Sequence, residues 1–146
     1  MSEQDPIVIV GSARTAMGGM QGDFAAVTAP QLGATAIEAA LQRAGINGDD
    51  VDEVIMGNVL GAGQGQAPAR QASKGAGIPD AVGATTINKM CGSGMKAAMF
   101  GHDLLVAGSA EVVVAGGMES MSNAPYLLPN ARSGMRLGHG EVKDHM

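Results

Sequence analysis

Aromatic residues are scarce in this sequence: among its 146 residues only Phe24, Phe100 and Tyr126 are aromatic. The formal net charge is −5, and no run of basic residues occurs anywhere in the chain. Proteins that bind nucleic acid need a basic face or aromatic side chains on which bases can stack. These two absences exclude nucleic acid as an expected partner.

Long apolar runs are also missing, because no stretch approaches the ~18 residues that a membrane-spanning helix needs. Residues 1–6 lack a basic start and lead straight into an apolar run, so no signal or transit peptide is visible. The chain has one cysteine, Cys91, which excludes an internal disulfide and fits a reducing compartment. We therefore expect a cytoplasmic protein with no membrane partner and no metal site.

What the sequence does contain is typical of a globular α/β protein. Hydrophobic residues make up 45% and charged residues 16%, and the 23 glycines and 6 prolines indicate many tight turns. Short β-branched runs alternate with segments of helical periodicity, which predicts parallel βαβ units. Strands are expected at residues 7–10, 54–56, 85–90 and 110–117.

Three helices are expected between these strands. The first is capped by Thr28 and ended by Gly45, and the second runs from Pro68 to Lys74. The third follows Cys91 and extends to about residue 107. Its apolar residues recur at three- and four-residue steps, so they should form the buried face: Met95, Ala98, Met99, Leu105 and Val106.

The periodic pattern fails after Met118, where polar residues, glycine, proline and methionine alternate without a period. We expect residues 1–118 to form the α/β domain and residues 119–146 to begin a loop domain. Three helices do not fully cover a parallel sheet of four strands, so the sheet should be incomplete. A dinucleotide loop around Gly61 and Gly63 is disfavoured, because Gln66 stands where the third glycine of that pattern belongs.

Cys91 lies at the join between a predicted strand and a predicted helix. A helix N-terminus offers partial positive charge and unpaired N–H groups, which favour a thiolate and can hold a carbonyl oxygen that becomes negative. Gly92 and Gly94 permit a tight turn and leave room for an acyl group. The alternative is a buried structural cysteine that acts as a small hydrophobic residue.

Three segments carry a resemblance to a known family. Residues 87–97, Ile-Asn-Lys-Met-Cys-Gly-Ser-Gly-Met-Lys-Ala, resemble the acyl-enzyme motif of the thiolases. Residues 114–122, Val-Ala-Gly-Gly-Met-Glu-Ser-Met-Ser, resemble their second N-terminal motif, and Ala-Arg-Thr at 13–15 resembles their opening segment. Gly92 stands where many members have alanine. The resemblance covers essentially the whole chain and implies a thiolase-like layered fold of which this is the N-terminal half.

The resemblance implies that Cys91 takes an acyl group from acyl-CoA and that a second acetyl-CoA attacks the resulting thioester to give acetoacetyl-CoA. Thiolysis is the reverse reaction. The backbone N–H of Cys91 would form part of an oxyanion hole. Acetyl-CoA, other acyl-CoA and CoA would be substrates, with no further cofactor, and residues that bind CoA are not identified. The family also implies a homodimer or homotetramer for the full-length protein, and a place in fatty acid metabolism.

Thiolases are more than twice as long, and their second half supplies a histidine, a second cysteine and an asparagine-held water. His102 cannot replace that histidine, because at eleven residues along the same helix it would lie about 16 Å from Cys91. His139 and His145 are expected to be solvated loop residues. The chain alone is therefore expected to be inactive. Two alternatives remain: a truncated assembly module that pairs through residues 85–90, and a relative of the ketoacyl synthases.

Overall fold

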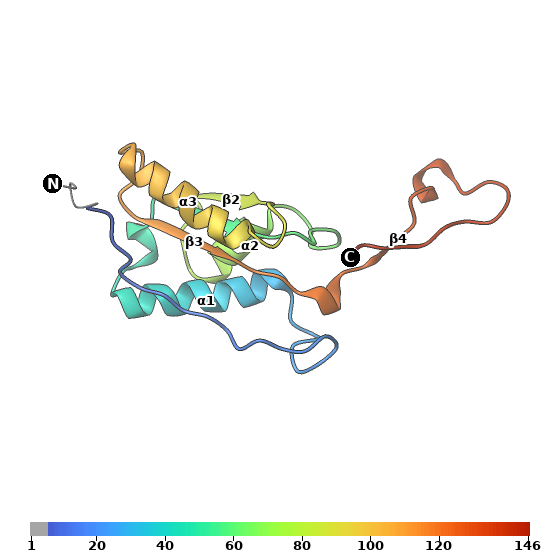
Figure 1. Cartoon of the computed structure of the whole chain (residues 1–146), viewed down its shortest axis with the longest axis horizontal. Coiled ribbons are helices and arrows are strands. Elements are labelled where there is room, and N and C mark those ends of the chain that lie inside the picture. Colours follow the sequence, from blue (N-terminus) through green and yellow to red (C-terminus); the bar gives the residue numbers. More distant parts are fainter. Residues whose placement is uncertain (1–5) are drawn as a thin grey trace.

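The computed structural model describes residues 6–146 and has three layers (Figure 1). A parallel sheet forms the middle layer, with the order β2-β1-β3. Helix α3 covers one face of the sheet, while α1 and α2 pack against each other on the opposite face. The predicted α/β class and parallel sheet are confirmed. The bounds are α1 Ala29–Ala44, β1 Glu53–Gly57, α2 Pro68–Gly75, β2 Gly83–Ile87, α3 Ser93–Val106 and β3 Val113–Gly117.

Strand β1 is buried on both faces, as the centre of a covered sheet should be. Val54 and Met56 are at most 2% exposed and belong to the hydrophobic core formed with α1 and α2. Gly57 faces the other way and meets the first turn of α3. Successive residues of β1 therefore face α1 and α2 on one side of the sheet and α3 on the other.

Both ends of α1 lie where the sequence predicts them. The hydroxyl of Thr28 accepts a hydrogen bond from the N–H of Gln31, and the Gln31 side chain accepts one from the N–H of Thr28, which completes a capping box. Gly45 follows the helix in the left-handed conformation, with a φ of 68°. These two local signals fix the length of the helix without help from the core.

The predicted buried face of α3 is wrong. The helix buries Ser93, Ala97 and Gly101, whereas Met95 and Met99 are 71% and 52% exposed. A Cβ on Gly101 would lie only 3.1 Å from a methyl group of Val113, so this stripe of small residues lets the helix lie close to the sheet. The apolar periodicity predicts the helix correctly. The small size of Ser93, Ala97 and Gly101, and not hydrophobicity, decides which side of the helix packs against the strands.

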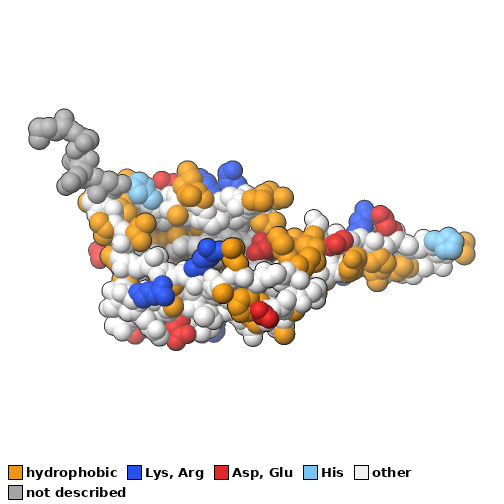
Figure 2. Space-filling model, turned by 60° about the horizontal axis from the view of Figure 1, so that its bottom comes forward, with side chains coloured by type: hydrophobic (Ala, Val, Ile, Leu, Met, Phe, Trp, Pro, Cys, Tyr) orange, Lys and Arg blue, Asp and Glu red, His pale blue; other side chains and the backbone are white. Residues whose placement is uncertain are grey.

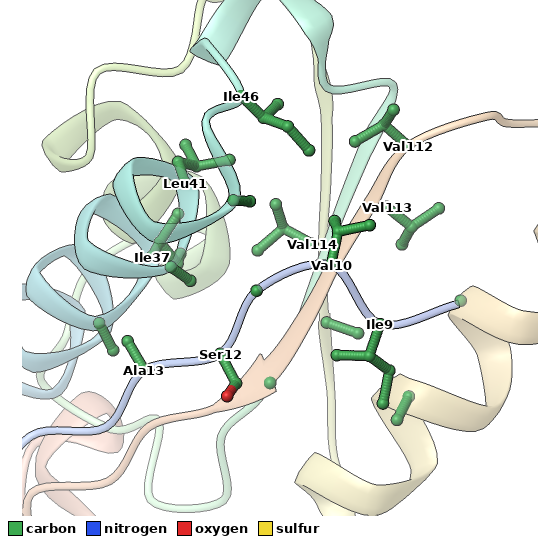
Figure 3. Close-up of a pocket in the computed structure, with 18 of the residues that line it drawn as sticks. Ile9, Val10, Ser12, Ala13, Ile37, Leu41, Ile46, Val112, Val113 and Val114 are labelled. Carbon is green, nitrogen blue, oxygen red and sulfur yellow. The ribbon is translucent and has the colours of Figure 1, made fainter. Parts of the chain in front are cut away.

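The strand predicted at residues 7–10 is also wrong. This segment runs beside β3 and along α1 without forming a strand, and Val8, Ile9 and Val10 are 71%, 91% and 60% exposed. An open cavity of about 580 Å³ lies between the segment, α1, α3 and β3 (Figure 3). Apolar side chains from both sides point into it, Ile37 and Leu41 among them. Because the cavity separates the segment from β3, no ladder of hydrogen bonds joins the two.

Residues 126–146 project from the body as a long excursion (Figure 1). A short antiparallel pair, β4 Tyr126–Leu127 and β5 Lys143–Asp144, closes its base, a feature that the irregular sequence does not indicate. Hydrophobic side chains lie exposed along it, and others gather on the body (Figure 2). Single 3₁₀ turns occur at Gly48–Asp50, Met121–Asn123 and Ala131–Ser133.

The base of the excursion is tied to the body by His145, which corrects the expectation of a solvated loop histidine. Its backbone N–H donates to the carbonyl of Pro125 at 3.2 Å, and its ring Nε2 accepts the N–H of Ala62, also at 3.2 Å.

Among residues 6–146, no helix is long and apolar enough to cross a membrane.

Candidate active site

Cys91 lies in a five-residue turn between the end of β2 at Ile87 and the start of α3 at Ser93, and it is exposed. The strand predicted for residues 85–90 begins at Gly83 and ends three residues earlier than expected. The reason is local: Met90 has a φ of 49°, which no strand residue adopts, and its N–H is held by the side-chain oxygen of Asn88 at 3.0 Å. We call residues 88–92 the elbow.

The elbow rests on the carboxyl end of the sheet. A Cβ on Gly57 would lie 2.6 Å from the Cβ of Ser93, and a Cβ on Gly117 would lie 3.3 Å from the Cα of Gly94. Glycine at the ends of β1 and β3 therefore makes room for the first turn of α3 directly above the strands. In open α/β proteins, ligands bind at the carboxyl edge of the parallel sheet. Cys91 therefore lies at the edge where a ligand is expected.

In the first turn of α3 the N–H of Ser93 donates to the carbonyl of Met90, while the N–H groups of Gly94 and Met95 have no hydrogen-bond partner within residues 6–146. Gly92 is the N-cap residue and has no side chain to accept a hydrogen bond from the helix, and the first turn contains no acidic residue. Positive partial charge is therefore available to an anion at the elbow. The nearby ammonium of Lys96 lies 4.1 Å from the centre of the Phe100 ring, which orients it along the helix.

A second loop, residues 58–65, follows β1 at the same edge and is held by Glu119. The Glu119 carboxylate accepts hydrogen bonds from the side chain of Asn58 at 2.9 Å and from the N–H groups of Val59 and Leu60 at 2.9 and 3.0 Å. The sequence alone assigns no role to Asn58 or Glu119. A signal existed, since Asn58 directly follows β1 and Glu119 comes two residues after β3, and the ends of neighbouring parallel strands meet at one edge.

One of the three histidines, His145, contacts the second loop, where its ring Nε2 accepts the N–H of Ala62. His102 is exposed on α3 with its ring 3.8 Å from the Asp103 carboxylate, and His139 is exposed in the excursion. Within the described part of the chain, no three side chains of histidine, cysteine, aspartate or glutamate gather in a way that could hold a metal ion.

Comparison with known proteins shows to which family this chain belongs. The family model described as "Thiolase, N-terminal domain" matches residues 7–146. The chain belongs to the thiolase family. The resemblance to the thiolase family is thus confirmed, and the elbow lies within residues 87–97, one of the segments that carry that resemblance.

Individual thiolases agree closely with this chain. An acetyl-CoA acetyltransferase from Cupriavidus necator is 55% identical over 140 residues, which cover 96% of this chain and 36% of that relative. The cytosolic acetyl-CoA acetyltransferase of Gibberella zeae is 50% identical over 144 residues, 99% of this chain and 36% of the relative. A thiolase from Ascaris suum, crystallised in complex with coenzyme A, matches with a TM-score of 0.89 and 37% identity over 93% of this chain and 35% of its own.

These relatives are much longer than this chain. The chain spans about a third of the length of the thiolases that it matches. The layered fold and the family are therefore established, while the activity of the whole protein belongs to the proposal that follows.

Proposed function

We propose that Cys91 is the acyl-accepting nucleophile of an acyl-CoA:acetyl-CoA C-acyltransferase, of which these residues form the N-terminal part. The observation that carries the proposal is the exposure of this thiol in the elbow before α3, in a chain of the thiolase family. A thiolate is the nucleophilic form of cysteine, and an exposed cysteine side chain is open to an acyl donor.

The chemistry has two steps. The Cys91 thiolate attacks the carbonyl carbon of an acyl-CoA, the carbon–sulfur bond to CoA breaks, and CoA leaves as a thiolate that takes up a proton. A second acetyl-CoA then loses an α-proton to a base, and its carbanion attacks the Cys91 thioester. The new carbon–carbon bond gives acetoacetyl-CoA, and the Cys91 thiolate is released. Thiolysis by CoA reverses both steps.

The chain's own contribution is to bind and stabilise the oxygen that becomes negative in each step. The backbone N–H of Cys91 is one donor to that oxygen, and the elbow sets its direction. The groups that move protons are supplied from outside these residues, so the 146-residue chain by itself should release CoA from acetyl-CoA no faster than background.

We also propose that residues 119–146 begin a separate loop domain, that the whole protein is a cytoplasmic homo-oligomer and that acyl-CoA and CoA are its only small-molecule partners.

One alternative has an observation in its favour. The assembly module was predicted to pair through residues 85–90, and β2, which contains the first three of them, stands at one end of the sheet order β2-β1-β3. The exposed Met95 and Met99 of α3 would also suit a module that assembles with a partner and performs no chemistry. A ketoacyl synthase relative is less well supported, because the thiolase model accounts for residues 7–146.

A chimeric enzyme tests the proposal. The corresponding 140 residues of the Cupriavidus necator acetyltransferase are replaced by this chain, and cleavage of acetoacetyl-CoA by CoA is followed by absorbance. We expect activity in the chimera and a loss of at least about 10³-fold in its Cys91→Ser variant. A folded chimera whose activity survives Cys91→Ser contradicts the assignment of the nucleophile, and a folded chimera without activity supports the assembly module.

A further inference from the structure

The elbow contains a backbone conformation that its sequence does not favour. Met90 has a φ of 49°, in the left-handed region that side-chain-bearing residues rarely adopt, and it directly precedes Cys91. A residue in that region stays there only if its surroundings hold it. The direction in which Cys91 leaves the backbone depends on Met90, so whatever holds Met90 also aims the thiol.

Ser93 holds both ends of this conformation with one hydroxyl group. Its Oγ accepts the N–H of Lys89 at 2.8 Å and donates to the carbonyl oxygen of Met90 at 2.6 Å. The backbone N–H of Ser93 donates to the same carbonyl at 3.0 Å. Ser93 is only 4% exposed, so water does not readily replace either bond.

We infer that Ser93 is a positioning residue for the Cys91 thiol. The inference rests on the proposed role of Cys91 as nucleophile. Ser93 touches neither substrate nor the reacting sulfur in this account. It locks Lys89 and Met90 so that Cys91 stands exposed just before the first turn of α3. Without the hydroxyl, Met90 relaxes toward an ordinary φ, and the side chain of Cys91 leaves the backbone in a different direction.

The rival explanation is that Ser93 only fills space between α3 and Gly57. The chain offers a matched control for it. Ser73 in α2 is also fully buried, but its Oγ has no hydrogen-bond partner within residues 6–146, and α2 lies on the opposite face of the sheet. Ser73→Ala therefore makes the same chemical change in a buried helix without touching the elbow.

Alkylation by iodoacetamide is the test, because Cys91 is the only thiol in the chain and its reaction is read without background. The second-order rate constant is measured for the 146-residue chain and for Ser93→Ala and Ser73→Ala. We expect Ser93→Ala to slow the reaction about tenfold, because the elbow no longer holds the thiol in one direction. Ser73→Ala should stay within about threefold of the unaltered chain.

An unchanged rate constant in folded Ser93→Ala overturns the inference, and so does an equal slowing in Ser93→Ala and Ser73→Ala. If Ser93→Ala loses the helical circular dichroism of the unaltered chain, Met90→Gly alone is compared with Met90→Gly combined with Ser93→Ala. Glycine adopts a positive φ without strain, so the second substitution should then have little effect on the rate constant. A tenfold slowing of the double variant relative to Met90→Gly contradicts the role of Ser93. Because iodoacetamide replaces acetyl-CoA, the outcome does not depend on the identity of the acyl donor.

Discussion

Gly57, the last residue of β1, faces Ser93, the first residue of α3, so closely that a Cβ on Gly57 would lie 2.6 Å from the Cβ of Ser93. The backbone of Gly94 is equally near, so α3 has to move before any side chain fits at position 57. Gly57→Ala should therefore destabilise the chain by about 1–3 kcal/mol, the usual result of overpacking, and change the alkylation rate of Cys91. Urea unfolding and iodoacetamide kinetics measure the two effects.

Gly19→Ala is the matched control, because nothing lies within 4 Å of a Cβ at that position. It should change the free energy of unfolding by no more than about 0.5 kcal/mol. Equal effects of the two substitutions would show that α3 does not rest on the sheet at Gly57.

Glu119 should stabilise the loop at residues 58–65 through its three hydrogen bonds. Glu119→Gln removes the charge and one acceptor while keeping the shape of the side chain. We expect a loss of about 1–3 kcal/mol, because two of the bonds come from backbone N–H groups that have no replacement in the loop. Hydrogen exchange at Val59 and Leu60 should become faster. Glu141→Gln, at an exposed carboxylate, is the control; unchanged exchange in Glu119→Gln would refute the role of this carboxylate.

The ionisation of Asp52 should make the free energy of unfolding depend on pH in the acid range. Hydrogen bonds from the N–H groups of Val112 and Glu111, at 3.0 and 2.7 Å, hold the pKa of its carboxyl below the ordinary value, although the side chain is exposed. A lowered pKa in the folded state stabilises the fold above the unfolded pKa of about 3.9, and this contribution disappears as the pH falls through the folded pKa. Asp52→Asn should thus be less stable than the unaltered chain at pH 7, with the difference shrinking as the pH falls below about 3.9.

Urea unfolding at several pH values checks this, with Asp49→Asn as a control that removes the same charge nearby. A difference between Asp52→Asn and the unaltered chain that stays constant from pH 7 to pH 2 would rule out the carboxylate as its source.

Residues 7–13 should exchange their amide hydrogens much faster than β1. The segment lies across the cavity from β3 without a strand ladder, while residues 53–57 pair on both sides. Hydrogen exchange followed by mass spectrometry of peptides resolves the two regions. Slow exchange at residues 7–13, comparable with β1, would show that the segment pairs as a strand after all.

Local signals predicted a large part of this fold. The capping box at Thr28, the proline that opens α2 and the left-handed glycine after α1 each act within a few residues, so the sequence alone locates those helix ends. The turn at Cys91 was found in the same way, from glycines between a strand pattern and a helical pattern. Parallel strands followed from their alternation with helices.

The errors concern contacts between distant residues. Whether residues 7–10 form a strand depends on the width of the space beside β3, which no local pattern reports. The buried face of α3 depends on how closely Gly101 approaches Val113. The carboxylate of Glu119 and the ring of His145 bind amides 59 or more residues away, so their partners were invisible in the sequence.

Trapping the acyl group tests the central claim most directly. The chimeric acetyltransferase that carries this chain is mixed with acetyl-CoA, quenched in acid within the first turnover and digested, and the peptides are weighed by mass spectrometry. We predict one acetyl group per chain, on the peptide that contains Cys91 and absent from the Cys91→Ser variant. An active chimera whose acetyl group sits on any other residue, or on none, would contradict the account.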